Sequence, residues 1–342
     1  MKIRTFWEYS PKTEAERLIH CAHQIAVEFY RVNNFIVLPY NPNIKNANIV
    51  TFPDLPYNKI PRFWEKVKKM NIYAHPIKFE KSLVDETQKI IGLAKISKPD
   101  FEKIKKLWSK VENAVVSELY KIILASKNKI NKITIFPTAF GTNTSFDWLS
   151  KSGEITIWLR NDQGISTIAE AIISSITRDD VYNKLGGMWQ ESEIITDWLV
   201  TESSLAKIIA KYDKTPFLPT MRGVRVKQQA KLLAESDEFY KKLGLPVNQK
   251  VFGLNGLTPE VNKKPLENLS PTEKIILRLL IQKAGGVVTF DEFGNELFGD
   301  ENDFSLYAIS KNIERLRNKL EANGISGSYI QTLRSKGYVL KN

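Results

Sequence analysis

The chain has 342 residues, of which 42% are hydrophobic and 26% charged, as is ordinary for a folded globular protein of two or three domains. No apolar run reaches the roughly 20 residues of a membrane span, and the charged N-terminal stretch has no apolar signal core. We therefore expect a cytoplasmic protein without a membrane segment. The single cysteine, Cys21, excludes an internal disulfide and suits a reducing compartment.

The net charge of +12 favours a nucleic-acid partner only where basic residues gather on one face. Residues 266–342 hold ten basic and ten acidic side chains, so the whole excess lies before them. Within this neutral stretch, acidic residues gather at 291–303, whereas basic residues gather at 311–319 and in the segment 334–336. DNA phosphates interact with the charge of the protein face next to them and not with the net charge of the domain. This segregation of charge is therefore compatible with DNA binding.

The N-terminal region, delimited as residues 1–130, predicts helices joined by turn-rich segments. Helices are expected over 13–32, 61–70, 82–92 and 98–126, and a strand at 35–40. His20 and His23 lie three residues apart on the first helix and could bind a metal, but surface or packing histidines are the favoured interpretation. Four lysines between 103 and 110 are interpreted as a solvated face, with an accessory phosphate-contacting surface as the alternative.

Residues 131–248 predict an α/β region that can be continuous with the preceding one. Strands are expected at 133–136 and 154–159, with a loop at 137–153 between them. Helices are expected over 166–178, from Glu191 onward, and over 224–243.

One run in the helix 166–178, Ala169-Glu170-Ala171-Ile172-Ile173, bears on catalysis. With a long helix and two strands before it and an acidic helix after it, this order resembles the small zincin metallopeptidases. The resemblance puts Glu170 at the general base of the His-Glu-x-x-His motif and Glu193 near the third ligand, but Ala169 and Ile173 replace both histidines. Zinc needs about three lone-pair donors. This resemblance therefore implies a degenerate zincin-like scaffold with no metal, no cofactor and no catalytic residues.

The favoured interpretation of this region is nevertheless an ordinary α/β domain in which Glu170, Glu193 and Asp197 are surface or capping residues. The phosphate-binding motif GxxxxGK[ST] and the nucleotide-binding motif GxGxxG are both absent from the sequence. None of the three histidines lies near a nucleophile elbow. We therefore do not expect an enzyme.

The C-terminal region, 251–342, has the clearest local signals. Ser270 and Glu273 form a capping box, and Thr289 and Glu292 form a second one. A third helix is expected over 305–321, and a hairpin over 329–340 around the turn 334–337. The predicted buried stripe of the third helix comprises Leu306, Ile309, Ile313, Leu316 and Leu320.

The segments SPTE, SLYAISKNIERLRNKLE and IQTLRSKGY, in this order and at these distances, resemble the OmpR/PhoB-type winged-helix DNA-binding domain. The similarity covers residues 270–338, with a lead-in sheet expected over 251–269. The predicted fold class is thus α+β: an N-terminal mixed α/β domain followed by a C-terminal winged helix-turn-helix. The receiver domain that normally precedes this winged helix has no counterpart in the sequence, so control by phosphorelay is not expected.

This resemblance implies which residues meet DNA. Arg315 is the candidate for a bidentate contact to guanine, and Arg334 matches the arginine that enters the adjacent minor groove. Glu314 replaces a basic residue, and would select cytosine or weaken binding. The implied DNA-binding set comprises Ser310, Lys311, Glu314 and Arg315 facing the groove, Asn312 and Arg317 toward flanking phosphates, and Arg334 and Lys336 in the wing.

We therefore expect sequence-specific binding of double-stranded DNA by a transcription regulator whose N-terminal domain senses or docks an unidentified ligand or protein. The resemblance further implies a homodimer on tandem half-sites and a contact with RNA polymerase. Two alternatives remain open: an atypical peptidase-like enzyme that the winged helix targets, and a protein-docking module.

Overall fold

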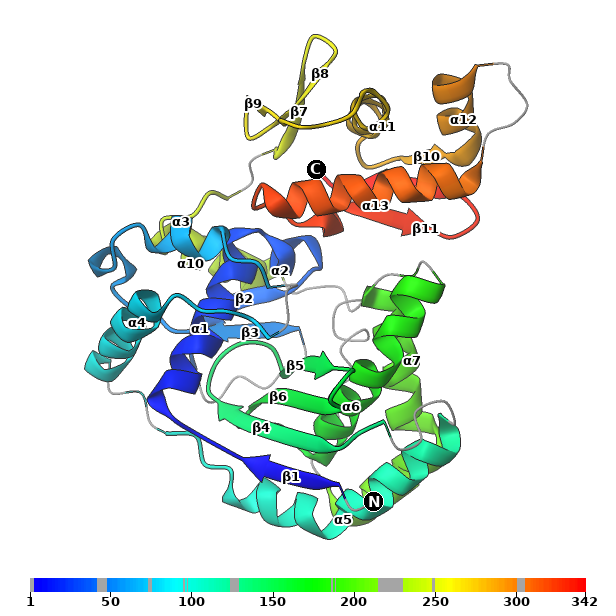
Figure 1. Cartoon of the computed structure of the whole chain (residues 1–342). Coiled ribbons are helices and arrows are strands. Elements are labelled where there is room, and N and C mark those ends of the chain that lie inside the picture. The colour runs from blue at the N-terminus through cyan, green and yellow to red at the C-terminus, as the bar shows by residue number, and fades with distance from the viewer. Residues whose placement is uncertain are drawn as a thin grey trace. The chain divides into compact units, whose positions relative to one another are not determined.

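The computed structural model describes residues 3–41, 48–72, 76–94, 96, 98–123, 129–185, 187, 189–214, 230–247, 250–299 and 305–342. The chain forms two compact units, whose elements are labelled in Figure 1. Unit 1 comprises Met1–His23 and Asn34–Leu243, and unit 2 comprises Gln24–Asn33 and Gly244–Asn342. In the described part, no helix is both long and apolar enough to cross a membrane.

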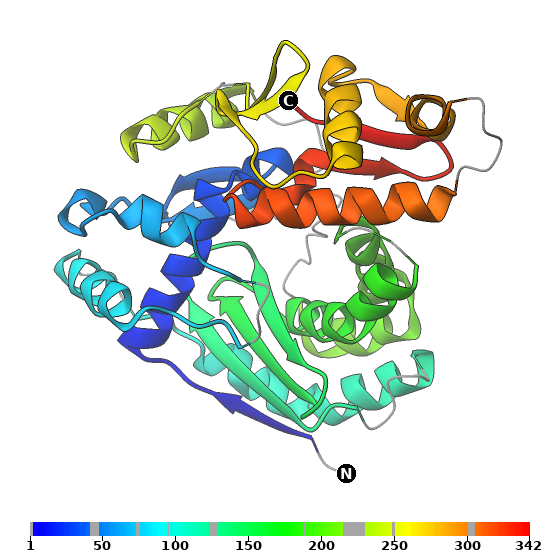
Figure 2. The same cartoon turned by 45° about the horizontal axis from the view of Figure 1, so that its top comes forward.

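A four-stranded sheet of order β1-β4-β6-β5 forms the centre of unit 1. Strands β1 (Arg4–Trp7), β4 (Lys132–Thr138) and β6 (Glu154–Arg160) are parallel, and β5 (Thr144–Leu149) runs antiparallel to β6. Figure 2 shows β4, β5 and β6 side by side. Because β1 pairs with β4, the regions predicted as 1–130 and 131–248 share one sheet.

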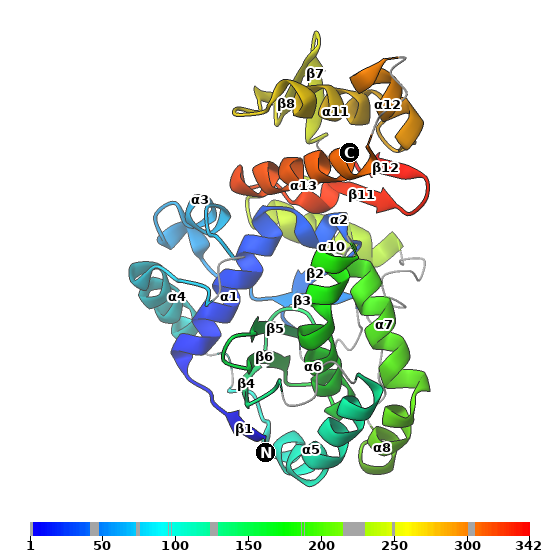
Figure 3. The same cartoon turned by 45° about the vertical axis from the view of Figure 1, so that its right-hand side comes forward.

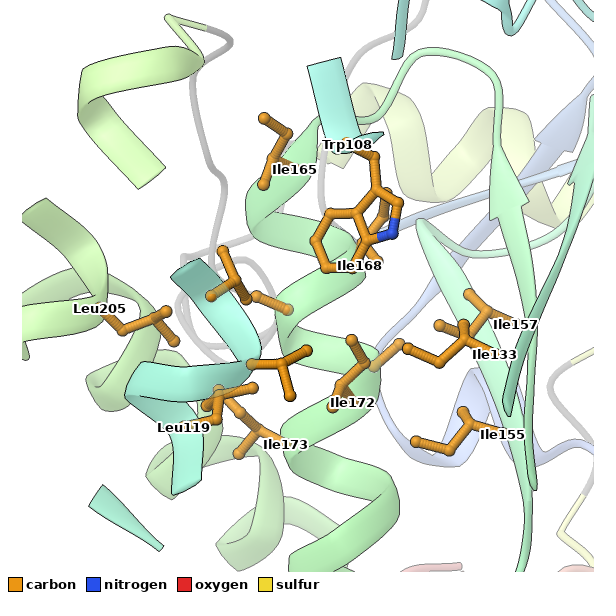
Figure 4. Close-up of a cluster of buried hydrophobic side chains, with 14 of the residues drawn as sticks. Trp108, Leu119, Ile133, Ile155, Ile157, Ile165, Ile168, Ile172, Ile173 and Leu205 are labelled. Carbon is orange, nitrogen blue, oxygen red and sulfur yellow. The ribbon is translucent and has the colours of Figure 1, made fainter. Parts of the chain in front are cut away.

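Helices surround this sheet and a second, two-stranded parallel sheet of β2 (Ile36–Pro39) and β3 (Ile49–Phe52). Their bounds are α1 (Pro11–Ala26), α3 (Phe63–Lys68), α4 (Lys81–Leu93), α5 (Glu102–Ile122), α6 (Ile165–Asp179), α7 (Trp189–Glu202), α8 (Ser204–Tyr212) and α10 (Ala230–Lys242), with short turns η1 (Tyr57–Lys59) and η3 (Asp180–Lys184). Helix α6 packs on β5, β6 and α7 (Figures 1 and 3). The main core joins Trp108 of α5 to Ile133 and Ile155 of the sheet and to Ile172 of α6 (Figure 4).

Two predictions for residues 1–248 need correction, and a third is covered only in part by the described residues. The helix expected over 13–32 is interrupted, because α1 ends at Ala26, Glu28 adopts a left-handed conformation with φ 62°, and α2 (Phe29–Val32) follows. The loop expected at 137–153 contains β5, in which Phe146 and Trp148 alternate with polar residues and every side chain is half-buried. The predicted helix over 224–243 is described from Ala230 onward, and its first residues lie outside the described part.

Of the two histidines on α1, His23 is a packing residue. His23 is 2% exposed, and its Nδ1 lies 2.7 Å from the carbonyl oxygen of Val67. Burial lowers the pKa of His23, so the neutral ring is favoured.

The described residues between 250 and 342 in unit 2 form three α-helices and two small sheets. The helices are α11 (Pro271–Gln282), α12 (Phe290–Phe298) and α13 (Leu306–Ala322). The lead-in sheet pairs β7 (Phe252–Asn255), β8 (Thr258–Val261) and β9 (Lys264–Pro265), and the second sheet has the order β10-β12-β11, from β10 (Val287–Thr289), β11 (Ile330–Leu333) and β12 (Gly337–Leu340). Strand β10 was not predicted, because it has only three residues and directly follows the two glycines that end α11.

Both predicted capping boxes are confirmed. The hydroxyl of Ser270 accepts from the N–H of Glu273 and the carboxylate of Glu273 accepts from the N–H of Ser270, and Thr289 and Glu292 repeat the exchange. Each box satisfies amide groups that the first helical turn leaves without a partner. The starts of α11 and α12 are therefore determined locally.

The pairing of β10 with β12 explains the glycine at 337. Gly337 has φ 143°, and a Cβ there would lie 2.0 Å from the carbonyl oxygen of Val288 on β10. Any side chain would thus collide with the neighbouring strand as well as strain the backbone. The hairpin can join β10 only with glycine at this position.

Residues Gln24–Asn33, here called the strap, complete unit 2 from a distant part of the sequence. The N–H of Ser326 donates to the carbonyl of Val27 at 3.1 Å, and the hydroxyl of Tyr329 donates to the carboxylate of Glu28 at 2.7 Å. Val32 is 7% exposed and belongs to the same core as Ile276, Phe293 and other residues of the winged helix. The sequence carries no local signal for this packing, because its contacts span about 300 residues.

We predict that Tyr329→Phe destabilises unit 2 by about 1–3 kcal/mol, because the carboxylate of Glu28 loses a charge-assisted hydrogen bond. All seven tryptophans lie outside the described residues of unit 2, so tryptophan fluorescence is a poor probe of its unfolding. Hydrogen exchange of residues 326–341 is the suitable measurement. Glu28→Gln should accelerate exchange to a similar extent, and the double variant should add little. Tyr307→Phe is the matched control, since that ring is 71% exposed. Unchanged exchange in Tyr329→Phe would contradict the importance of the strap.

The two capping carboxylates should make unit 2 sensitive to acid. Lys283 and the Thr289 N–H hold the pKa of Glu292 at about 2. Burial raises the pKa of Glu273, but hydrogen bonds from Lys319 and Ser270 bring it below its ordinary value. Both groups therefore stabilise the folded unit above the ordinary pKa of 4.5, and this stability is lost as the pH falls toward about 2.

Hydrogen exchange of α11 and α12 between pH 5 and pH 2.5 (about the window of these shifts) should detect that loss, after correction for intrinsic exchange. Glu292→Gln should reduce the pH dependence at α12, while the exposed Asp291→Asn serves as control. An equal pH dependence of hydrogen exchange at α12 in the wild type and in Glu292→Gln would contradict the prediction.

Candidate nucleic-acid interface

Helix α13 presents one face to the core of unit 2 and the other to solvent. Its N-cap is Ser305, whose hydroxyl accepts from the N–H of Ala308. Ile309, Ile313, Leu316 and Leu320 are buried, as their three- and four-residue spacing predicts. Leu306, which the same spacing assigns to the buried stripe, is instead 53% exposed. The first turn of α13 therefore extends beyond the core.

The four residues predicted to face a DNA groove, Ser310, Lys311, Glu314 and Arg315, are all exposed. The ammonium of Lys311 lies 2.7 Å from the carboxylate of Glu314, and this hydrogen bond raises the pKa of Lys311. Arg315 makes no hydrogen bond or ion pair with residues that the structure describes. Ser310 is held at 3.1 Å from the hydroxyl of Tyr338 in the hairpin. The outer face thus carries one ion pair, Lys311 with Glu314, and the guanidinium of Arg315.

Arg317 points toward the protein. Its guanidinium donates to the carbonyl of Ile330 at 2.7 and 3.0 Å and to the hydroxyl of Thr332 at 3.0 Å. The ring of Tyr338 lies 5.9 Å from the same guanidinium, and burial lowers the pKa of Arg317. These contacts join α13 to β11 and β12. A contact of Arg317 with phosphate stays a prediction, and it would compete with these hydrogen bonds.

Asn312 also forms a hydrogen bond within the domain. Its amide donates to the carbonyl of Ala308 at 2.8 Å, one turn earlier in α13, and its side chain is only half-exposed. The carbonyl oxygen of that amide is not used in this bond. A phosphate contact by Asn312 likewise stays a prediction.

Sequence reasoning did not identify Lys319 and Tyr338 as organising residues. Lys319 donates to the carbonyl of Asn268 at 2.6 Å and pairs with the buried carboxylate of Glu273, so α13 is tied to the cap of α11. Tyr338 packs edge-on against Phe290 and Phe293 of α12. Neither role follows from local spacing, since every partner lies on another element.

The wing is the turn between β11 and β12. Arg334 and Lys336 are both exposed there. The N–H of Lys336 donates to the carbonyl of Leu333 at 3.0 Å, and Ser335 has φ 60°. Gly337, with the strand contact described above, ends the turn. The two basic side chains are therefore carried on a tightly constrained hairpin.

Charge in the described part of unit 2 is distributed as the sequence suggests. On α12, Glu292 pairs with Lys283 and Glu296 pairs with Arg278, so two acids are neutralised by cations of the α11 region. On α13 and the wing, the exposed charged residues named above include one carboxylate, Glu314. The acidic residues at 300, 301 and 303 lie outside the described residues. The outer face of α13 and the wing together remain basic.

The residues of the zincin hypothesis lie elsewhere, in unit 1. Ala169 and Ile173 are fully buried in the core, where alanine and isoleucine have no lone pair to offer a metal. Among the residues that the structure describes, no three His, Cys, Asp or Glu side chains are grouped to hold a metal ion.

The favoured prediction that Glu170, Glu193 and Asp197 are surface or capping residues is wrong. Their exposed fractions are 2%, 6% and 9%. Burial, and then the charge of Asp197, raises the pKa of Glu193 to about 7, although Arg178 and hydrogen bonds with Ser174 and Glu170 oppose the shift. The structure thus brings Glu170 of α6 and Glu193 of α7 together.

The helices, hairpin and exposed third helix of unit 2 define a winged helix-turn-helix domain. Comparison with known proteins agrees, because residues 263–340 match the family model described as "Transcriptional regulatory protein, C terminal". The chain therefore carries a C-terminal domain of the OmpR/PhoB type.

Individual relatives match a part of the chain. The chain is 35% identical over 80 residues to the sensory transduction protein BceR of Bacillus subtilis, covering 23% of this chain and 34% of the relative. It is 42% identical over 71 residues to the response regulator protein GraR of Staphylococcus haemolyticus, covering 21% and 31%. A solved structure, the C-terminal domain of the nisin resistance regulator NsrR, is 28% identical with a TM-score of 0.23, covering 28% of this chain and 98% of that one. The chain spans about a third of the length of these two curated relatives.

We predict that Arg317→Ala loosens the hairpin, because the buried carbonyl of Ile330 and the hydroxyl of Thr332 lose their donor. The expected cost is about 1–3 kcal/mol, measured as faster hydrogen exchange in residues 330–340. The matched control is Arg315→Ala, two residues away on the exposed face. Equal exchange in both variants would show that Arg317 does not position the hairpin.

Proposed function

We propose that this protein binds a specific sequence of double-stranded DNA through unit 2 and regulates transcription. The observation that carries the proposal is the exposed, basic outer face of α13 next to the basic wing, in a domain of the OmpR/PhoB type. A helix of this kind lies in the major groove, where outward side chains meet base edges while other contacts fix its position on the phosphates.

In the proposed complex, Arg315 recognises guanine, because its planar fork matches the O6 and N7 acceptors. Glu314 accepts from the amino group of cytosine, and its partner Lys311 offsets the repulsion between that carboxylate and the phosphates. Ser310, held by Tyr338, contacts a neighbouring base edge. Arg334 enters the adjacent minor groove and Lys336 contacts phosphate. Asn312 and Arg317 remain candidates for flanking phosphates, with Arg317 acting first as a positioning residue.

Selection of binding sites in vitro with the full chain tests this proposal. We expect Arg315→Ala to weaken binding to the selected site by about 1–3 kcal/mol and to relax the preference at one base pair. Lys336→Ala should instead weaken binding to all sequences equally. It should also reduce the slope of log K against log salt concentration by about 1, the value for one lost phosphate contact. A protein that binds its selected and random sequences equally, at about 0.15 M salt, would contradict the proposal.

For unit 1 we propose an input role: it senses a ligand or docks a protein and thereby alters DNA binding by unit 2. Binding as a homodimer to tandem half-sites and contact with RNA polymerase are further parts of the proposal. Selected sites that contain two direct repeats would support the dimer, whereas single half-sites would oppose it.

A zincin-like origin of unit 1 is kept as a hypothesis. Its support is the arrangement of α6 on the mixed sheet and the proximity of Glu170 to Glu193 on the following helix. A peptidase-like activity would require a metal bound by other residues. Metal analysis of the purified full chain tests this alternative, since one zinc ion per chain would favour it.

A further inference from the structure

The first turn of α13 exposes more apolar surface than its place next to the core requires. Tyr307 is 71% exposed and Leu306 is 53% exposed. Among the described residues of unit 2, the other exposed large hydrophobic side chains are Leu257 at 69% and Leu333 at 38%, and Leu333 ends β11 beside the wing turn. A single exposed aromatic needs no explanation. Here, however, three of the four belong to α13 and to the hairpin of β11 and β12.

Tyr307 lies on the same helical face as the residues proposed to meet DNA. Ser310 and Lys311 follow it by three and four residues, and Glu314 follows it by seven, so all lie along one side of α13. The ammonium of Lys311 is 5.9 Å from the centre of the Tyr307 ring, which places the two side chains next to each other. Tyr307 therefore extends the outer face to the N-terminal end of α13, the end from which recognition helices contact bases.

The chemistry of this end differs from that of the rest of the face. Ser310, Lys311, Glu314 and Arg315 offer polar or charged groups, whereas Tyr307 offers a flat apolar ring with one hydroxyl. In the major groove, the apolar group that distinguishes one base from the others is the C5-methyl of thymine. Because the Tyr307 ring is already exposed, it can contact that methyl group without giving up packing against the core of unit 2.

We propose that Tyr307 is a specificity-determining residue that recognises a thymine by packing its ring against the C5-methyl group. This inference rests on the proposed function, because it requires α13 to lie in the major groove. It adds to that function a base preference at the end of the site that meets the first turn of α13. The competing role for the same side chain is a hydrogen bond from its hydroxyl to phosphate, which would carry no sequence information.

The test uses the full chain and its selected DNA site, with each thymine replaced in turn by deoxyuridine, which lacks only the methyl group. At one position, this replacement should weaken wild-type binding about fourfold, the value of one buried methyl group. Tyr307→Phe should retain both the affinity and this fourfold effect, because the ring remains. Tyr307→Ala should bind more weakly, lose the effect of deoxyuridine at that position, and no longer select thymine there. Leu257→Ala, a similarly exposed residue outside α13, should behave as the wild type.

Each other outcome overturns the inference in a distinguishable way. If Tyr307→Phe weakens binding equally on all sequences, the hydroxyl contacts phosphate and the ring recognises no base. If the deoxyuridine effect persists in Tyr307→Ala, another residue contacts the methyl group. In both cases Arg315→Ala still relaxes the preference at its own base pair, so the proposed function stands. If no sequence is selected at all, the proposed function fails and the inference fails with it.

Discussion

The hydrogen bonds of the Arg317 guanidinium are the interactions on which the arrangement of α13 and the wing in unit 2 depends. They join α13 to the carbonyl of Ile330 and the hydroxyl of Thr332, so the helix and the wing have one relative position. A buried carbonyl needs a hydrogen-bond partner, and an arginine can supply two donors at once. With Lys319 tied to Glu273, inward-directed cations hold α13 at two places. The other side of the helix is therefore free to present Lys311, Glu314 and Arg315.

In unit 1, helix α7 buries acidic side chains and exposes apolar ones. Helix α7 buries Glu193 and Asp197, while Ile194, Ile195 and Trp198 of the same helix are 39%, 42% and 58% exposed. Burying carboxyl groups is unfavourable unless they share protons or hydrogen bonds. The raised pKa of Glu193 beside Asp197 is the expected response. An amphipathic reading of α7 would therefore have assigned its faces incorrectly, and nothing local in its sequence warns of the inversion.

Agreement between sequence and structure is closest where the determining interactions are short in range. Ser270 with Glu273 and Thr289 with Glu292 interact across three residues, and each box has the predicted hydrogen bonds. The exposed side of α13 follows from the spacing of Ile309, Ile313 and other buried residues. Spacing fails at Leu306, which belongs to the stripe but lies beyond the edge of the core. Strands β5 and β10 were also not predicted. They pair with β6 and β12, which lie elsewhere in the sequence.

The sequence by itself determined the capped helices, the hairpin and the residues that α13 turns outward, because caps and helical periodicity involve neighbours three or four residues apart. Only the tertiary structure decided that Arg317 faces the hairpin and that the strap completes the winged helix through Val27, Glu28 and Val32. Those contacts join residues 13 to about 300 positions apart. No local pattern encodes them, because their free energy appears only when the separate elements pack.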